Sequence, residues 1–329
     1  MSIFENKSVN EKTQEMIDTY DKWPEYARDS YKNSEPLDLP SDKIVFCGMG
    51  GSGIAFDIIS SLIPDKDIII NKGYFLPKNI SNSLIIVNSA SGNTIETITA
   101  LKSASKSKNK VIAFSSGGKI ETYCKKNNIL YRNYDLKSSP RASIPFSLYT
   151  ILGTLSESFG IKKAPISNSI KALENSRKKL NSKKNNPALD LAKFIKGYPV
   201  CYYSSEFFPV ALRFRQDFQE NCKKLAATEE VVESCHNSIN SWENPSGLSP
   251  ILLRGSNDHK LIKNRFEVWK EYFESRKIKY KEIIPTKGDL LSQFMALIYE
   301  MSTSTIYYAI QDGTDPTLLK AIDFVKARV

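Results

Sequence analysis

The chain has 329 residues, a length more typical of two domains than of one. Its 46 lysine and arginine residues outnumber 36 aspartate and glutamate residues, which gives a net charge of +10. The segment from Ile161 to Lys196 carries ten basic and two acidic residues and so holds most of that excess. The basic charge therefore does not indicate a nucleic-acid partner, because it is concentrated in one polar stretch.

Other classes are excluded by what the sequence lacks. It contains no apolar run of the ~18–20 residues that a membrane helix needs, so we expect no membrane partner. Residues 1–12 are polar, so we expect a cytoplasmic rather than an exported protein. The five cysteines form no C-x-x-C pair and predict free thiols in a reducing compartment. With only two histidines, His236 and His259, we expect no metal site.

The first half of the chain predicts an α/β domain. After an amphipathic N-terminal helical segment (1–35), short apolar runs alternate with helical patterns over 36–158. The predicted strands are 43–47, 67–71, 84–88, 110–114 and 129–133, and the helices between them are 54–62, 94–106 and 120–127. Strands that are apolar on both faces are typical of a parallel sheet. We expect a doubly wound, flavodoxin-like sheet of order 2-1-3-4-5.

The second half predicts a similar domain. Residues 159–187 are polar and basic, and we interpret them as a linker with one exposed helix; a polyanion-binding patch is the alternative. The α/β pattern resumes over 188–329, with strands at 200–203, 251–254 and 279–284 and helices at 209–225, 261–275, 290–311 and 318–327. Two such units suggest a duplication, although no residue-level repeat is convincing.

A glycine-rich loop follows the first predicted strand. Gly48-Met49-Gly50-Gly51-Ser52-Gly53 contains four of the 15 glycines of the chain and opens a helix. Glycine lets backbone N–H groups approach an anion closely, and the helix N-terminus adds free donors. The string also fits the dinucleotide pattern G-x-G-x-x-G, but the end of the second strand offers Asn71 instead of an acidic residue. A phosphate cradle is the preferred interpretation, with a dinucleotide site or a purely structural turn as alternatives.

A second polar loop follows the third predicted strand. Ser89-Ala90-Ser91-Gly92-Asn93-Thr94 also opens a helix, and its hydroxyls by themselves are explained as well by helix capping. In the predicted strand order, however, strands one and three are neighbours, so the two loops face one crevice. We therefore expect both loops to bind one phosphate monoester, through Gly50, Gly51, Ser52, Ser89, Ser91 and Thr94.

These loops and several later motifs carry a resemblance to a known family. The loops resemble those of the sugar isomerase (SIS) domain, and further motifs follow in order: Pro140-Arg141-Ala142-Ser143, Glu220-Asn221, His236-Asn237, Asp315-Pro316-Thr317 and Ile322-Asp323-Phe324-Val325-Lys326. Together they resemble the bifunctional phosphoglucose/phosphomannose isomerase family over residues 40–329. The resemblance implies two SIS domains, 36–158 and 188–329, and a homodimer.

The resemblance also implies roles for four residues, each of which has an ordinary alternative. Glu220 is the expected base that moves a proton between C1 and C2 of the sugar, although a helical glutamate is usually solvated. Arg141 is expected to stabilise the enediolate, although a loop arginine is usually exposed or paired with a carboxylate. His236 is expected to assist ring opening from the partner subunit, although a lone histidine is more often structural. Lys326, or alternatively Lys320, is the expected ring-opening lysine near the C-terminus.

The expected function is interconversion of glucose 6-phosphate and fructose 6-phosphate, together with mannose 6-phosphate, through an enediol and without a cofactor. A non-catalytic, sugar-phosphate-binding SIS regulator is the alternative. Such regulators usually carry a DNA-binding helix-turn-helix, for which the N-terminal segment leaves little room.

Overall fold

A computed structural model describes residues 10–137, 139–182, 184–244 and 247–328. Residues 1–9 of the predicted N-terminal segment and Lys183 of the predicted linker lie outside this range. The chain divides into two compact units. The first unit comprises Asp18–Ile170 with the residues from Ala321 onward, and the second comprises Lys171–Lys320 with the described residues up to Ile17.

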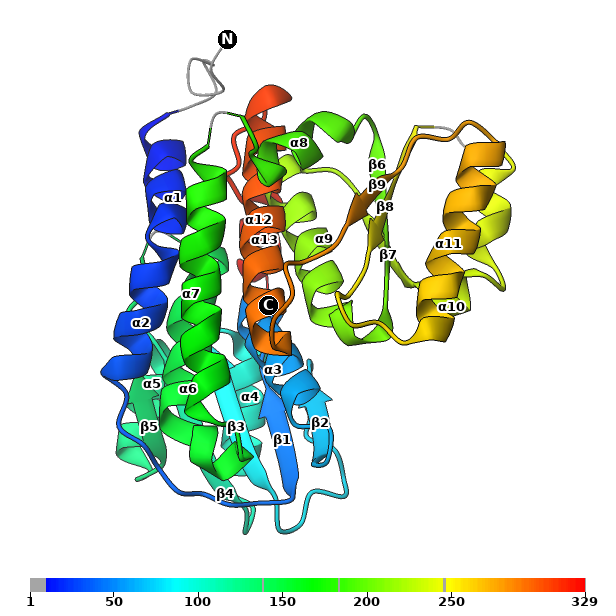
Figure 1. The fold of residues 1–329 in the computed structure, drawn as a ribbon. Coiled ribbons are helices and arrows are strands. Elements are labelled where there is room, and N and C mark those ends of the chain that lie inside the picture. The colour runs from blue at the N-terminus through cyan, green and yellow to red at the C-terminus, as the bar shows by residue number, and fades with distance from the viewer. Residues whose placement is uncertain (1–9, 138, 183, 245–246, 329) are drawn as a thin grey trace. The chain divides into compact units, whose positions relative to one another are not determined.

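The first unit contains the predicted sheet (Figure 1). Its described strands are β1 (Lys43–Cys47), β2 (Asp67–Asn71), β3 (Leu84–Ser89), β4 (Lys110–Ser115) and β5 (Leu130–Asn133). They are parallel and follow the order β2-β1-β3-β4-β5, which confirms the predicted topology. Residues of β1 and β3 are almost all buried, as strands covered on both faces must be.

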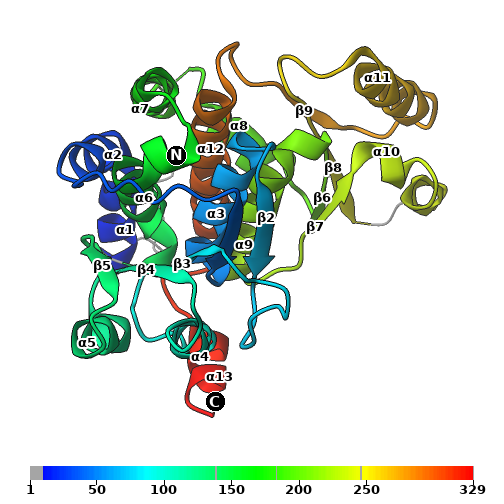
Figure 2. The same cartoon turned by 90° about the horizontal axis from the view of Figure 1, so that it is seen from below.

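Helices cover both faces of this sheet (Figure 2). The helices next to the sheet include α3 (Gly50–Leu62), α4 (Ile95–Ala104), α5 (Gly118–Lys126) and α6 (Ile144–Phe159). On one face Phe46 of β1 stacks on Phe56 of α3, with ring centroids 4.5 Å apart, and meets Phe159 of α6. On the other face Val45 and Val87 join Leu101 of α4 and Ile120 of α5 in one apolar cluster.

The predicted N-terminal helical stretch is two helices, α1 (Glu11–Asp21) and α2 (Trp23–Lys32). Pro24 stands in the first turn of α2, where its missing N–H costs no helical hydrogen bond. In the interior of one continuous helix the same proline would break the hydrogen-bond ladder, so the helix restarts there. Tyr26 of α2 then packs on Phe146 of α6.

The predicted linker is largely helical. It contains α7 (Lys163–Leu180), and α8 (Pro187–Phe194) begins at its last residue. One side of α7 is buried through Ile166, Ile170 and Leu173, while Arg177-Lys178-Lys179 form its basic last turn. The basic composition therefore belongs to the solvent-facing side of an amphipathic helix.

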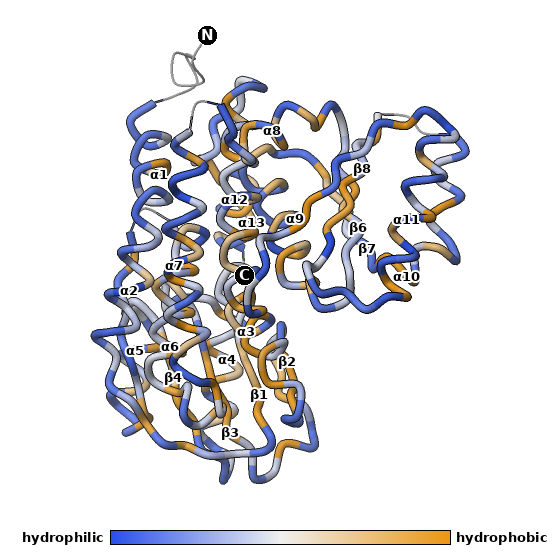
Figure 3. The backbone as a smooth tube through the Cα atoms, in the orientation of Figure 1, coloured by the Kyte–Doolittle hydropathy of each residue, from blue (hydrophilic) through white to orange (hydrophobic). Residues whose placement is uncertain are grey.

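The second unit holds a smaller parallel sheet. Its described strands are β6 (Tyr198–Tyr203), β7 (Ala227–Glu230), β8 (Leu248–Leu253) and β9 (Lys281–Ile283), in the order β7-β6-β8-β9. Strand β7 was not predicted, because its sequence Ala-Thr-Glu-Glu has no apolar run. Hydrophobic residues mark β8, whereas much of α11 (Lys260–Ser275) is hydrophilic (Figure 3).

Helices also flank the second sheet. Trp269 and Phe273 of α11 pack with Tyr202 of β6 on one face, next to α10 (Val231–Ser234). The long buried helix α12 (Leu290–Gln311) packs against α9 (Phe208–Cys222) and α8. The last helix, α13 (Lys320–Lys326), has no buried residue. No helix in the described part of the chain is long and apolar enough to cross a membrane.

Candidate functional site

The glycine-rich loop lies at the carboxyl end of β1, where α3 begins at Gly50. A side chain at Gly53 would place its Cβ 2.9 Å from the carbonyl oxygen of Gly48, and one at Gly48 would lie 3.0 Å from that of Asn88. Gly50 has a φ of +51°, in the left-handed region. The loop is thus closely packed against the end of β3, with the first N–H groups of α3 at its tip.

The hydroxyl-rich loop follows β3, the neighbour of β1 in the sheet. The hydroxyl oxygens of Ser89 and Thr94 are 3.0 Å apart, and the Ser91 hydroxyl accepts a hydrogen bond from the Asn93 N–H. The two loops are joined directly, because the N–H of Ala90 donates to Oγ of Ser52 at 2.9 Å. This joins the two predicted phosphate-binding segments at one edge of one unit.

A third loop, after β4, supports the second one. Gly92 has a φ of +65°, and a Cβ there would lie 1.8 Å from the carbonyl oxygen of Gly117. The N–H of Ile120 donates to Gly92, and that of Lys119 donates to Oδ1 of Asn93. The loop after β3 therefore has a fixed shape before any ligand binds, as a preorganised anion site requires.

Two residues that the sequence analysis did not select complete this edge. Asn88 is fully buried; its Nδ2 donates to the Ser52 carbonyl at 2.9 Å, and its Oδ1 accepts the Tyr134 O–H at 2.8 Å. Tyr134 follows β5 and is also buried. An apolar strand that ends in asparagine was the available signal for Asn88, but nothing in the sequence pairs it with Tyr134.

Arg141 lies in the same unit, on the short 3-10 helix η2 (Pro140–Ser143) that precedes α6. Its side chain is only 4% exposed, so the exposed loop arginine considered as its alternative is not what the structure shows. The helix η2 packs against α3, the helix that carries Ser52 in its first turn. A buried guanidinium retains its charge and five donors, which suits the stabilisation of an anion.

Glu220 and His236 lie in the second unit. Glu220 is half-buried in the last turn of α9, where Lys223 donates to its carbonyl oxygen at 2.7 Å. The next residue, Asn221, is buried and donates to Oγ1 of Thr305 in α12. His236 is exposed just after α10, and its N–H donates to the Glu233 carbonyl.

The second sheet does not bring Glu220 and His236 together. Helix α9 begins beyond the carboxyl end of β6 and returns alongside the sheet, so its last turn lies toward the amino ends of the strands. Helix α10 instead begins at the carboxyl end of β7, directly before His236. Lys326 and Lys320 are the last and first residues of α13, and both are exposed.

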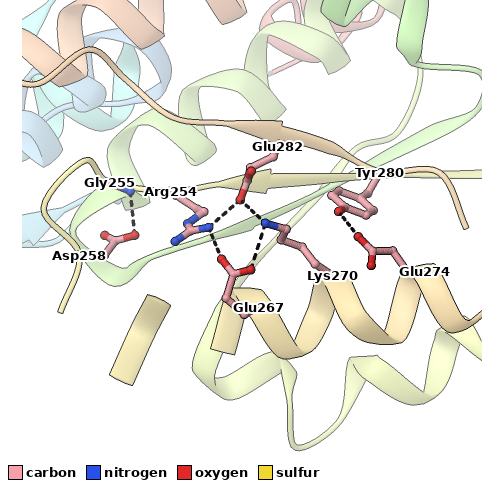
Figure 4. Close-up of polar contacts among 8 residues, drawn as sticks. All are labelled: Arg254, Gly255, Asp258, Glu267, Lys270, Glu274, Tyr280 and Glu282. Atoms are coloured by element: carbon pink, nitrogen blue, oxygen red, sulfur yellow. Dashed lines mark hydrogen bonds and ion pairs between the residues drawn. The ribbon is translucent and has the colours of Figure 1, made fainter. Parts of the chain in front are cut away.

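Side chains near the end of β8 in the second sheet pair with one another (Figure 4). Arg254, directly after β8, contacts Glu267 at 2.8 Å and Glu282 at 2.6 Å. The Gly255 N–H donates to the carboxylate of Asp258 at 2.9 Å. A Cβ at Gly255 would also lie 2.6 Å from the ring of Phe207, which follows β6. The backbone N–H of Gly255 is thus already bound to a side chain of the same loop.

Comparisons with known proteins show what this chain is similar to. Residues 184–329 match the model of the bacterial phospho-glucose isomerase C-terminal SIS domain. A bifunctional phosphoglucose/phosphomannose isomerase from Caldicellulosiruptor bescii is 28% identical over 304 residues, which covers 88% of this chain and 89% of that protein. One from Aquifex aeolicus is 27% identical over 93% of each chain. The crystal structure of glucosamine-6-phosphate deaminase from Thermotoga maritima is 17% identical, with a TM-score of 0.71 over 93% of this chain and 96% of that one.

The chain thus consists of two parallel α/β units, and residues 184–329 resemble the C-terminal SIS domain of the bacterial phospho-glucose isomerases. More particularly, the chain resembles the bifunctional phosphoglucose/phosphomannose isomerases over most of its length, as its motifs predicted.

Proposed function

We propose that this protein is an aldose–ketose isomerase that interconverts glucose 6-phosphate and fructose 6-phosphate, and also accepts mannose 6-phosphate. The observation that carries the proposal is the joined pair of loops after β1 and β3, linked by the hydrogen bond from Ala90 to Ser52. Gly50, Gly51, Ser52, Ser89, Ser91 and Thr94 bind the phosphate there. The similarity to isomerases of this name supports the choice of reaction.

The phosphate anchors the far end of an open-chain sugar, which orients C1 and C2. Glu220 takes the proton from one of these carbons and returns it to the other, so that the intermediate is an enediol. Arg141 stabilises the negative charge that develops on the enediolate oxygens. Its burial supports this role, because a guanidinium removed from water acts more strongly on a nearby anion.

Ring opening precedes this transfer and is the proposed task of His236 and Lys326. We place His236 in the active site of the partner subunit of a homodimer. The separation of Glu220 and His236 along one sheet supports this arrangement, as does the exposure of His236. The two SIS domains are 36–158 and 188–329. The protein acts in the cytoplasm, in glucose breakdown and synthesis, which its free cysteines support.

Acceptance of mannose 6-phosphate follows from the intermediate. An enediol is planar at C2, so proton return to the other face gives the mannose rather than the glucose configuration. This requires the intermediate to turn while its phosphate stays bound. No metal is needed for the route, since a guanidinium and backbone N–H groups stabilise the developing charge.

The test is a coupled assay on fructose 6-phosphate with no added cofactor, repeated with mannose 6-phosphate and in the presence of a strong chelator. We expect both substrates to react, each to inhibit the reaction of the other competitively, and chelator to leave both rates unchanged. Binding of sugar phosphate without turnover would instead support the alternative function, that of a non-catalytic regulator that binds sugar phosphates. Loss of the mannose 6-phosphate reaction in chelator would contradict the enediol route at one site.

A further inference from the structure

The buried side chain of Asn88 joins three segments at the carboxyl edge of the first sheet. It lies near the end of β3, donates through Nδ2 to the carbonyl of Ser52 and accepts through Oδ1 from Tyr134. Ser52 belongs to the segment after β1, and Tyr134 directly follows β5. One amide therefore connects parts of the chain that are 36 and 46 residues away from it.

Ser52 is held from two directions by neighbouring residues of β3 and its loop. Its carbonyl accepts from Asn88, and its hydroxyl accepts from the N–H of Ala90 at 2.9 Å. Because Ser52 is in the first turn of α3, these bonds fix the start of that helix against the loop after β3. Any change in the orientation of Asn88 would thus change the spacing of the two loops.

The two partners of Asn88 fit one orientation of its amide. The Ser52 carbonyl can only accept, so it selects the orientation in which Nδ2 faces it, and the Tyr134 O–H donates to the Oδ1 on the other side of the amide. Burial raises the pKa of Tyr134, and a hydrogen bond with Ser52 offsets part of that rise. The phenol therefore remains protonated and is a donor at every pH at which the enzyme would work. With Oδ1 bound to this donor, Nδ2 faces the Ser52 carbonyl.

We propose that Asn88 and Tyr134 are positioning residues that act on the binding of the substrate phosphate. Their hydrogen bonds set the distance between the glycine-rich loop at Ser52 and the loop from Ser89 to Thr94. This inference rests on the proposed function, in which both loops bind the phosphate. Both side chains are buried behind the two loops, so their contribution is to binding of the phosphate end and not to proton transfer.

The central test is Tyr134→Phe, which removes one hydroxyl and keeps the ring. Loss of the donor leaves Oδ1 of Asn88 buried without its partner. A loss of this kind typically changes an equilibrium constant about ten-fold, and here the affected equilibrium is the binding of phosphate. We expect KM for fructose 6-phosphate and the inhibition constant of inorganic phosphate to rise by the same factor, roughly ten-fold. The value of kcat should stay within about two-fold of the wild type.

A matched control is Tyr149→Phe. Tyr149 is a fully buried residue of α6 in the same unit, and its hydroxyl lies 2.7 Å from Oγ of Ser169. Its loss should lower the midpoint of thermal unfolding much as Tyr134→Phe does, without raising KM or the phosphate inhibition constant. Asn88→Asp is a second probe, because its carboxylate can still accept from Tyr134 but cannot donate to Ser52. It should weaken phosphate binding at least as much as Tyr134→Phe.

Three results would overturn the proposal. The first is a Tyr134→Phe enzyme that loses thermal stability but keeps its KM and phosphate inhibition constant. The second is a fall in kcat with KM unchanged, and the third is an equal rise in KM in Tyr149→Phe. If the wild type shows no isomerase activity but binds inorganic phosphate, the proposed function fails. The phosphate dissociation constants of the three variants, measured by calorimetry, then still decide the positioning role.

Discussion

The ammonium group of Lys72 lies 2.6 and 2.9 Å from the two oxygens of the Asp57 carboxylate. Asp57 is 3% exposed and lies in the middle of α3, whereas Lys72 directly follows β2 and is 34% exposed. A Cβ at Gly53 would lie 3.4 Å from Cε of Lys72, so the lysine stem also covers the first turn of α3. The pair therefore anchors the helix that begins at the proposed phosphate site.

Lys72→Met should lower the free energy of unfolding by about 3 kcal/mol near neutral pH, because it leaves a buried carboxylate without its cation. Burial raises the pKa of Asp57, and Lys72 opposes that rise. A raised folded-state pKa means that stability is lost as pH rises from the unfolded value through the folded one. Removal of Lys72 raises the folded-state pKa further, so the destabilisation should be larger at pH 7.5 than at pH 4.5.

Urea unfolding of both proteins at the two pH values measures this difference. Lys66→Met is the control, since Lys66 pairs at 2.8 Å with the fully exposed carboxylate of Asp42. It should change stability little at either pH. A Lys72→Met protein that is equally destabilised at pH 4.5 and 7.5 would show that the buried charge is not the cause.

Gly92→Ala should be strongly destabilising. Its Cβ would lie 1.8 Å from the carbonyl oxygen of Gly117, and its φ of +65° is unfavourable for any residue with a side chain. We expect a loss of more than ~3 kcal/mol, or no folded protein. Gly160→Ala separates the steric clash from the backbone strain, because Gly160 has a φ of +73° but an added Cβ there would have nothing within 4 Å. That variant should lose only about 1 kcal/mol, as thermal unfolding would measure.

Glu220→Gln should reduce kcat by ~10²-fold or more while sugar-phosphate binding persists, because only the base of the proton transfer is removed. Steady-state kinetics and calorimetric titration with fructose 6-phosphate separate the two effects. Glu206→Gln is the control, since Glu206 is an exposed glutamate of the same unit. A Glu220→Gln enzyme that retains half of its kcat would remove Glu220 from the mechanism.

Truncation after Val325 should leave the fold intact and reduce activity on ring-closed substrate. Helix α13 has no buried residue, so removal of its end exposes no core. The midpoint of thermal unfolding should therefore be nearly unchanged, whereas loss of Lys326 should slow ring opening. Lys326→Ala and Lys320→Ala, assayed separately, identify the lysine involved. Unchanged activity in the truncated protein and in Lys320→Ala would mean that neither lysine acts.

Patterns that are local in the sequence were sufficient to predict most of the first unit. Its strands are continuous apolar runs, and such runs are apolar because both faces of a parallel strand are buried. The glycines of Gly48–Gly53 also predicted a tight turn, because close backbone packing at Gly48 and Gly53 leaves no room for a side chain. The order of the strands then brought the two loops to one edge.

The tertiary structure alone decided the features that depend on partners distant in the sequence. Strand β7 has a polar sequence and becomes a strand only through its pairing with β6. Asn88 reads as an ordinary polar residue until Tyr134, 46 positions later, is placed within 2.8 Å of it. The side chain of Asp57 is tolerated in the core only because Lys72 reaches it. A buried polar group is stable only when its hydrogen-bonding or charge partner is present, and the chain path in three dimensions determines which partner that is.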